Sequence, residues 1–497
     1  MPRCSMGGPD TPPDPTADHV TISLPPVPAL RLLTLLACLV ALVVAAPADA
    51  SSSQKVVFEA PRDLLNAQTR PAALVQLEHL GVNAIRVILA WNDVAPTPDA
   101  KTAPAGFDAT DPASYDWGQY DAVMAAAAER NWKVLLTVAS PVPRWATPGG
   151  VDHLTRPDDL DFQNFMTAVG RHYGKQVKLI SIWNEPNQPQ FLLPQYQSGQ
   201  PVSPRIYRGL YQAAIKGLQG SGNYTGMQIL FGETSPVGNG HVVAPLTFLR
   251  GALCLSAAYK MASSCSKLPM AGYAHHAYTT KAGPFFVPPS PNDVTIGVLP
   301  RLTSALNAAG AAGAIPKGTP IYLTEFGIQS LPDPIFGVPL AQQAEYLGIS
   351  EHIAYENPRV KLFSQYLLRD DQTLGGPPID AYSGFQSGLE LANGKKKPSY
   401  SSWPVPLTVT RGSSTAVTFW GLVRPAAGST RVEVEVKDGK GAWKRLLTKQ
   451  TNSSGYWTAG STFRGGRVWR VVWTSPAGVI YTGAAIRAYS TAGKLEG

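Results

Sequence analysis

The feature that most constrains the fold of this 497-residue chain is a repeat of short apolar runs, each followed by a longer amphipathic segment. Continuous apolar runs are typical of strands that are buried on both faces, and their alternation with helical segments predicts parallel strand–helix units. Closing eight such units into a barrel removes both free edges of the sheet, so the predicted fold class is α/β, a (β/α)8 TIM barrel. The predicted strands are 56–59, 84–90, 133–139, 178–183, 228–232, 272–277, 320–325 and 360–367.

The segments between these runs carry apolar residues three or four positions apart, which is the spacing of an amphipathic helix. Long loops rich in proline and tryptophan follow the strands rather than the helices. We therefore expect the rim at the carboxyl ends of the strands to carry the function. The predicted helices are 62–80, 115–130, 158–173, 204–218, 245–253, 293–309 and 340–355.

The pattern changes after Trp403-Pro404-Val405-Pro406 to short alternating runs separated by turns such as Asp438-Gly439. About ninety residues of this kind predict a small all-β sandwich of the immunoglobulin-like type. We place a catalytic barrel domain at 51–403 and the sandwich domain at 404–497. The predicted sandwich strands are 407–410, 416–422, 431–436, 443–447, 455–459 and 468–474.

Residues 1–50 have the features of a signal peptide. Arg31 precedes an apolar run at 32–46, and Ala48-Asp49-Ala50 offers small residues for cleavage before Ser51. The run has 15 residues, fewer than the roughly 20 needed to span a membrane. The segment predicts a secreted, extracellular protein, with a retained anchor as the alternative.

Two cysteines, Cys254 and Cys265, remain once Cys4 and Cys38 leave with the signal. An even pair in an exported chain indicates a disulfide that closes a small loop, with two buried free thiols as the alternative. Two isolated cysteines without nearby histidines do not supply the four ligands of a structural zinc site. The chain also has no Walker-type loop, no His-Glu-x-x-His and no Gly-x-Ser-x-Gly. We therefore expect neither a metal nor a cofactor.

The formal net charge is +8, and lysine and arginine are spread along the chain apart from Lys395-Lys396-Lys397. A nucleic-acid-binding protein concentrates its basic residues in a stripe or patch. We therefore expect no nucleic-acid partner. A weak attraction to acidic polysaccharide or cell wall is compatible with this charge, and the sequence carries no signal for an oligomeric state.

Two glutamates each come directly after an apolar run, where a barrel strand would end. Glu185 stands in Trp183-Asn184-Glu185-Pro186-Asn187, and Glu325 stands in Thr324-Glu325-Phe326-Gly327. They lie 140 residues apart, the length of three strand–helix units, so a closed barrel brings both to one rim. Two facing carboxylates can hydrolyse a glycosidic bond. The pair predicts a glycosidase acting on a poly- or oligosaccharide, and a structural glutamate is the alternative for each.

The Asn184-Glu185-Pro186 string after the fourth strand, with Glu325 ending the seventh, resembles the clan A glycoside hydrolases, and families 5 and 39 are the most similar. The resemblance covers about 350 residues of the predicted barrel, up to Trp403. It implies a retaining double displacement with Glu185 as acid/base and Glu325 as nucleophile. The two carboxyl groups would then stand about 5 to 5.5 Å apart.

The same resemblance implies further site residues. Arg86 matches the strand-two arginine near the nucleophile, although half of an ordinary salt bridge is the alternative. His276-Ala277-Tyr278 is similar to the His-Pro-Tyr of strand six, whose tyrosine hydrogen-bonds the nucleophile, and Ala277 departs from that pattern. From alternation along the strand, only one of two adjacent histidines can face the barrel centre, and we expect this to be His276. Asn184 offers an amide to a sugar hydroxyl.

Sugars bind on exposed aromatic faces, so aromatic residues near the glutamates are candidate substrate-binding residues. Trp91 follows strand two and Trp145 follows strand three, and we expect both to form subsite walls, with a core tryptophan as the alternative. Strand eight lacks the tryptophan that often lies in the central subsite of the clan. We expect Tyr366 to take its place.

Two other functions compete with a secreted glycosidase. One is a barrel that has lost activity and only binds carbohydrate, against which the presence of both glutamates, Asn184 and Tyr278 argues. The other is a cell-surface adhesive module that works through exposed tryptophans of the sandwich. We expect most of those tryptophans to be core residues. Contact between the C-terminal domain and cell wall or polysaccharide is compatible with the glycosidase.

Overall fold

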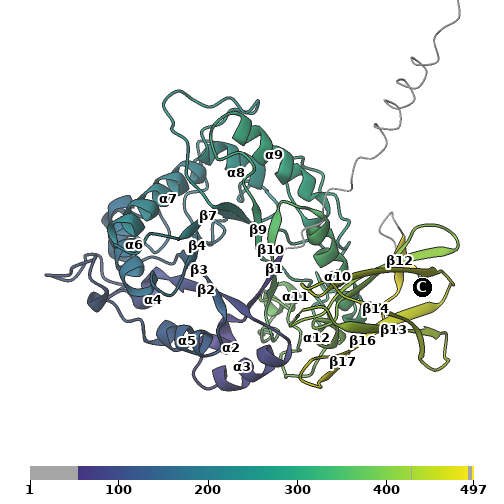
Figure 1. Ribbon diagram of the computed structural model, residues 1–497. Helices are drawn as coiled ribbons and strands as arrows, with labels where there is room; N and C mark the ends of the chain where they lie inside the picture. Colours follow the sequence, from purple (N-terminus) through teal and green to yellow (C-terminus); the bar gives the residue numbers. More distant parts are fainter. Residues whose placement is uncertain (1–53, 427, 491–494, 497) are drawn as a thin grey trace, which may run out of the picture. The chain divides into compact units, whose positions relative to one another are not determined.

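The computed structural model describes residues 54–426, 428–490 and 495–496 (Figure 1). The predicted signal peptide, residues 1–50, lies outside this part of the chain. Within it, no helix is long and apolar enough to cross a membrane.

Eight parallel strands form a closed barrel in the order β1-β10-β9-β8-β7-β4-β3-β2 (Figure 1). The predicted α/β barrel is therefore confirmed, and the predicted strand limits agree with it to within two residues. Apolar side chains on both faces of the strands are buried between the barrel interior and the surrounding helices. The strands are β1 Lys55–Glu59, β2 Ala84–Ala90, β3 Lys133–Ala139, β4 Leu179–Ile182, β7 Gln228–Thr234, β8 Gly272–His276, β9 Ile321–Glu325 and β10 Val360–Tyr366.

The helices that surround the barrel follow the predicted segments with two differences. The helix predicted at 293–309 begins only at Leu299, after a short 3-10 turn at Ile296–Val298. The single helix predicted at 62–80 is two helices, because Asn66 is extended and its side chain accepts a hydrogen bond from the Gln68 backbone N–H. This local turn ends the first helix. The main helices are α2 Pro61–Leu65, α3 Arg70–His79, α5 Gly118–Glu129, α6 Asp159–Tyr173, α7 Ser203–Gly220, α8 Pro245–Ala252, α9 Leu299–Ala311 and α10 Leu340–Glu356. Shorter helices are α4 Trp91–Val94, α11 Pro378–Ala381 and α12 Pro398–Ser402.

The C-terminal region is the predicted all-β sandwich, built from two sheets in the orders β15-β12-β11-β18-β19 and β14-β13-β16-β17. Alternate residues of the strands, such as Val432, Val434, Trp469 and Val471, fill the core between the sheets. Three short strands near the end were not predicted. The strands are β11 Leu407–Arg411, β12 Ala416–Leu422, β13 Arg431–Asp438, β14 Lys444–Gln450, β15 Tyr456–Thr462, β16 Arg467–Thr474, β17 Ile480–Thr482, β18 Ala488–Ser490 and β19 Leu495–Glu496.

Helix α10 joins the sandwich to the barrel through buried ion pairs and aromatic contacts. Glu351 of α10 forms a two-pronged pair with Arg424, with distances of 2.9 and 2.7 Å. Glu345 does the same with Arg487, at 2.8 and 2.7 Å. The ring of Trp420 stacks on His352 at 4.7 Å. Because Glu345, Glu351 and Arg424 are removed from water and Arg487 is half-buried, the interface constrains the sandwich against the barrel more than a flexible linker would.

A disulfide joins Cys254 and Cys265, as the spacing of the two cysteines indicated. The bridge follows α8 directly and closes the loop that leads toward β8. Close to it, Arg208 of α7 donates hydrogen bonds to the backbone carbonyls of Ala252 and Ser266. The loop is thus attached to the neighbouring helix at both of its ends.

The buried pair between Glu351 and Arg424 predicts a strong dependence of stability on α10. Glu351→Ala leaves the Arg424 guanidinium buried without its partner, and we expect a loss of about 3–5 kcal/mol in the free energy of unfolding. Urea denaturation of the purified protein measures it. The matched control is Glu433→Ala, which removes an exposed pair with Arg431 and should cost less than about 1 kcal/mol. Equal losses in the two variants would contradict the buried interface.

Candidate active site

The two glutamates predicted to act together reach the same rim of the barrel. Glu325 is the last residue of β9. Glu185 follows β4 by three residues, after a turn in which Trp183 has a φ of 72° and Glu185 a φ of 39°. This turn places the backbone N–H of Glu185 on the carbonyl of Glu233, at 2.9 Å. Glu185 and Glu325 keep 9% and 7% of their surface exposed, so both are partly desolvated but reachable.

His276 lies between the two glutamates and limits their separation. Its Nδ1 is 2.9 Å from Oε1 of Glu185 and 3.7 Å from Oε2 of Glu325. These two oxygens are therefore no farther apart than the sum of those distances, 6.6 Å. The carboxyl groups of Glu185 and Glu325 thus both lie on the Nδ1 side of one imidazole.

Arg86, on β2, is the centre of the cluster. Its side chain is completely buried, and its planar guanidinium contacts groups from five other barrel strands or the loops that follow them. Such a buried cation is tolerated only where acceptors surround it. The contacts are Nη1 to Glu325 (2.7 Å) and Glu59 (2.6 Å), Nη2 to Asn184 (2.8 Å) and Glu233 (2.9 Å), and Nε to Thr137 (3.1 Å).

Two buried glutamates of this cluster, Glu59 and Glu233, were missed in the sequence analysis. Glu59 is the last residue of β1, and Glu233 is the penultimate residue of β7. Both strands were predicted, and an acidic residue at the carboxyl end of a parallel barrel strand was the signal that was overlooked. Glu233 is fully buried, and its Oε2 accepts hydrogen bonds from Arg86, His276 and the Thr324 hydroxyl.

The two adjacent histidines point in different directions. His276 faces the barrel centre, with Nε2 2.6 Å from Glu233 and Nδ1 2.9 Å from Glu185. His275 instead contacts Thr234 through Nδ1 at 2.9 Å and the carbonyl of Val294 through Nε2 at 2.8 Å. The side chains alternate as expected for a strand. Only His276 joins the cluster.

Tyr278 and Tyr366 lie beside Glu325. The Tyr278 hydroxyl donates a hydrogen bond of 2.8 Å to Oε1 of Glu325, on the opposite side from Arg86. Tyr366 ends β10, pairs in register with Glu59, and packs edge-on against Phe385 at 5.2 Å. Phe385 also lies 5.9 Å from Tyr278, so the two tyrosines and this phenylalanine form an aromatic wall next to the carboxylate.

The expectation for Trp91 is wrong. Trp91 has no exposed surface and stacks on Phe165 of α6 at 4.9 Å, because α4 begins at this residue and turns its side chain into the helical layer. A sugar cannot reach it. Trp145 is half-buried, packs edge-on against Trp91 at 5.7 Å, and donates its indole N–H to the carbonyl of Pro96. Its role in substrate binding stays a prediction.

The cluster contains two carboxyl groups whose pKa is raised, and a carboxylate and an imidazolium whose charged forms are favoured. Burial raises the pKa of Glu185, and the hydrogen bond from His276 only partly opposes this. Burial also raises the pKa of Glu59 to about 7, against the charge of Arg86. For Glu233 the charge of Arg86 and the bond from His276 outweigh burial and lower its pKa to about 2. Burial disfavours the imidazolium of His276, but Glu325, Glu185 and Glu233 raise its pKa to about 10.

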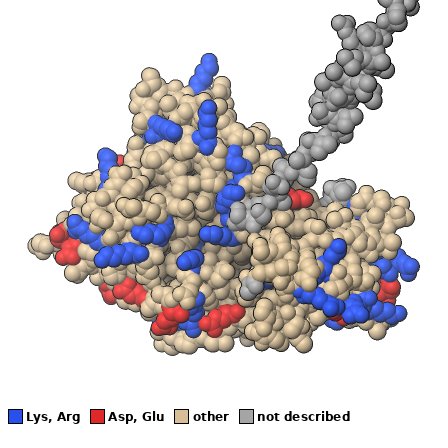
Figure 2. All heavy atoms as spheres, viewed as in Figure 1, with Lys and Arg blue, Asp and Glu red and all other residues tan. Residues whose placement is uncertain are grey.

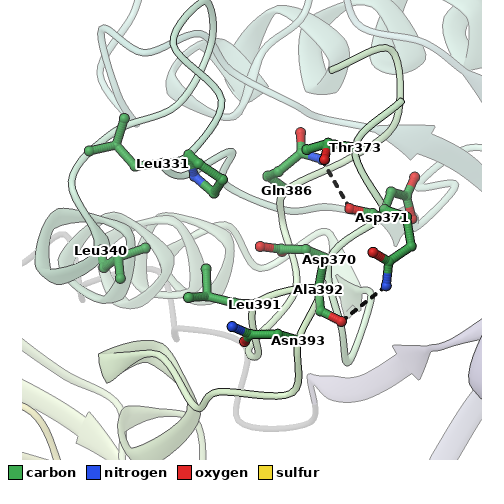
Figure 3. Close-up of a pocket in the computed structure, with 11 residues that line it drawn as sticks. Leu331, Leu340, Asp370, Asp371, Thr373, Gln386, Leu391, Ala392 and Asn393 are labelled. Atoms are coloured by element: carbon green, nitrogen blue, oxygen red, sulfur yellow. Dashed lines mark hydrogen bonds between the residues drawn. The ribbon is translucent and has the colours of Figure 1, made fainter. Parts of the chain in front are cut away.

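A separate cavity of about 500 Å³ lies between the loops that follow β9 and β10 (Figure 3). Asp370 and Asp371 line it, and both are buried. Asp370 pairs with Lys397 at 2.7 Å, and Asp371 pairs with Arg62. None of the glutamates of the cluster lines this cavity. In the described ranges, no group of three or more His, Cys, Asp or Glu side chains is arranged to hold a metal ion.

No protein-family model matches the chain, and no curated protein matches its sequence. Solved structures do match. A glucosidase from Croceicoccus marinus is 12% identical over 88% of this chain and 96% of its own length, with a TM-score of 0.50. A family 39 glycoside hydrolase from Bacteroides cellulosilyticus WH2 is 15% identical over 81% of each chain, with a TM-score of 0.49. At such low identity the likeness shows the fold alone.

The pKa of His276 predicts how stability depends on pH. Folding raises this pKa from 6.5 to about 10, so the contribution to stability is complete below pH 6.5 and is lost as the pH rises through about 10. We expect the free energy of unfolding, measured in urea at pH 7, 8.5 and 9.5, to fall with pH.

The slope should be flatter in His276→Gln, whereas His241→Gln, a change at an exposed histidine, should keep the wild-type slope. Identical slopes in all three proteins would contradict a protonated His276 in the cluster.

Proposed function

We propose that the chain is a retaining glycoside hydrolase of clan A, with Glu185 as acid/base and Glu325 as nucleophile. The observation that carries the proposal is that Oε1 of Glu185 and Oε2 of Glu325 both lie near Nδ1 of His276, so that these two oxygens are at most 6.6 Å apart at the rim of a closed barrel. Retaining enzymes place the two groups about 5 to 5.5 Å apart, whereas inverting enzymes need about 6.5 to 9.5 Å to admit a water molecule.

In the first step, an oxygen of Glu325 attacks the anomeric carbon of the sugar. The glycosidic carbon–oxygen bond breaks, and Glu185 gives its proton to the departing oxygen. The raised pKa of Glu185 suits this donation. Arg86 and Tyr278 each donate to a different oxygen of Glu325. These bonds orient the carboxylate for attack.

In the second step, Glu185 removes a proton from a water molecule, which attacks the anomeric carbon and releases Glu325. The carboxylate of Glu185 that this step requires faces Nδ1 of His276. Glu233 holds the other ring nitrogen at 2.6 Å. A protonated His276 therefore stabilises the base form of Glu185. Asn184 donates its amide to a sugar hydroxyl while its carbonyl oxygen stays on Arg86.

The same proposal includes export of the protein. The apolar run at 32–46, the small residues before Ser51, and the disulfide between Cys254 and Cys265 support it. Disulfides persist in oxidising compartments and are rare in the cytosol. A carbohydrate of the extracellular space is the matching substrate class.

Replacing either glutamate tests the catalytic pair. We expect Glu185→Gln and Glu325→Gln each to reduce kcat on an aryl glycoside panel by about 10²–10⁴-fold or more, with unfolding transitions close to wild type. Azide should restore part of the activity of Glu185→Gln only, because a small anion can attack the glycosyl enzyme without a general base.

Proton NMR of the first product should show that the anomeric configuration is kept. A product of inverted configuration would contradict the retaining mechanism. Near-wild-type turnover in either variant would contradict the catalytic role of the residue that was replaced.

Glu233 is assigned here as a positioning residue, since it has no exposed surface with which to touch substrate. Glu233→Gln replaces a charged acceptor of three hydrogen bonds and should lower kcat by about 10²-fold through misplacement of His276 and Arg86. Glu59→Gln is the comparison. At pH 6 Glu59, with a pKa of about 7, is already largely neutral, so its loss should be much smaller.

The pH profile separates positioning from simple loss of stability. Glu233→Gln should shift the limb of the kcat profile that reports Glu185, while a protein that is merely destabilised keeps its profile. A Glu233→Gln enzyme with wild-type kcat and profile would show that His276 is held without this carboxylate.

A further inference from the structure

The charge of the chain is divided unequally between its two regions. Residues 404–497 contain 13 Lys and Arg against four Asp and Glu, a net charge of +9. Residues 1–403 contain 29 against 30, a net charge of −1. The positive charge is therefore a property of the sandwich alone, which corrects the view of it as spread along the chain.

Most of this charge gathers on one of the two sheets. The five-stranded sheet faces the barrel, with Trp420 and Tyr456 packed against Tyr355 of α10. The four-stranded sheet β14-β13-β16-β17 is the other layer. Figure 2 shows blue side chains gathered on the sandwich, at the right of the view. We call the outer surface of this sheet and its turns the basic face, and its cations are Arg431, Lys437, Lys440, Arg445, Arg464, Arg467 and Arg470. Lys444 and Lys449 of β14 are paired with the core residues Val436 and Val432, so they lie on the other face of the sheet.

Acidic side chains neutralise only part of the basic face. Glu433 pairs with Arg431 at 3.2 Å, Glu435 with Arg470 at 2.7 Å, and Asp438 with Arg467 at 2.7 Å. Over the described residues, the remaining cations except Arg445 have no carboxylate within 4.0 Å. The unpaired cations of the sheet and its turns are Lys437, Lys440, Lys444, Lys449 and Arg464, and all of them except Lys444 and Lys449 belong to the basic face.

The protection of a free sheet edge explains only some of these lysines. Lys444 and Lys449 stand on β14, an edge strand, where lysine prevents pairing with another chain. Lys437 stands on β13, which has a neighbour on both sides. Lys440 and Arg464 lie in the turns that precede β14 and β16. The excess charge therefore continues beyond the edge.

An aromatic ring lies among these cations. Trp443 is half-buried, with the guanidinium of Arg470 at 4.3 Å and the ammonium of Lys437 at 5.9 Å from its ring. It is the sandwich tryptophan outside the core, whereas Trp457, Trp469 and Trp473 are buried. An aromatic face beside cations suits a ligand that has both an apolar ring face and a negative charge.

We propose that the basic face binds an anionic polysaccharide, with uronate-type carboxylates on the cations and a sugar ring on Trp443. The choice of a polysaccharide over other polyanions rests on the proposed glycosidase function, but the binding itself does not require catalysis. The buried ion pairs on α10 keep the sandwich attached to the barrel. A polymer bound here is thereby kept near the enzyme.

Binding of the intact chain to polygalacturonate tests the proposal. Retention should occur at low ionic strength and be lost near about 0.5 M NaCl, where exposed charges are screened. The triple variant Lys437→Gln, Lys440→Gln, Arg464→Gln should bind about tenfold more weakly. The matched control removes three exposed barrel lysines, Lys133, Lys175 and Lys317, and should stay within about twofold of wild type. Turnover of an uncharged aryl glycoside should be unchanged in both.

A second variant, Trp443→Ala, separates sugar recognition from charge. It should weaken binding to polygalacturonate but not to polyglutamate, which offers carboxylates without sugar rings. Equal losses in the two triple variants would reduce the effect to net charge and overturn the proposal. Tighter binding to duplex DNA or to phosphatidylglycerol vesicles than to polygalacturonate, or equal binding to a neutral glucan, would overturn it as well. Failure of the catalytic variants would leave these results unaffected.

Discussion

The buried guanidinium of Arg86 is the interaction on which the carboxyl-terminal end of the barrel depends. Removing a guanidinium from water costs free energy, and so does removing a carboxylate. The buried cation and the buried carboxylates therefore stabilise one another. Arg86 contacts Glu59 from β1, Glu233 from β7 and Glu325 from β9. Removing this cation would leave three buried acids to repel one another. The five hydrogen-bond donors of arginine make one residue sufficient for a task that lysine, with a single ammonium, could not perform in this geometry.

His276 adds a second cation and makes the environments of Glu233 and Glu185 different. Arg86 and His276 both contact Glu233, which keeps that carboxylate ionised and fixes the orientation of the imidazole. Glu185 contacts His276 through one oxygen and the Gln188 amide through the other, without a contact to Arg86, and burial raises its pKa. Carboxyl groups of one kind thus become a fixed anion and a proton donor through position alone. Glu233, the most deeply buried of these groups, favours the protonated form of His276, and His276 in turn favours the ionised form of Glu185.

The sequence was sufficient to predict the barrel because each strand is a continuous apolar run. Such a run can be recognised without knowledge of the tertiary contacts that it makes. Glu185 and Glu325 were found because motif residues surround them. Glu59 and Glu233 stand at strand ends without such motifs, and their importance comes from Arg86, which only the closed barrel brings near. Trp91 was misplaced for a related reason. Its neighbour in the sequence is a strand end, but α4 and the ring of Phe165 decide where it points.

Charged side chains of the sandwich have different roles at the interface with the barrel and on the exposed basic face. Glu345 and Glu351 lie on α10, the helix between β9, which carries Glu325, and β10. Their pairs with the half-buried Arg487 and the buried Arg424 therefore attach the sandwich to the helix that follows β9. At the interface and around Arg86, where water is excluded, each buried cation has a carboxylate partner. On the basic face water solvates the cations that lack such a partner, and there a ligand with carboxylates can take the place of water.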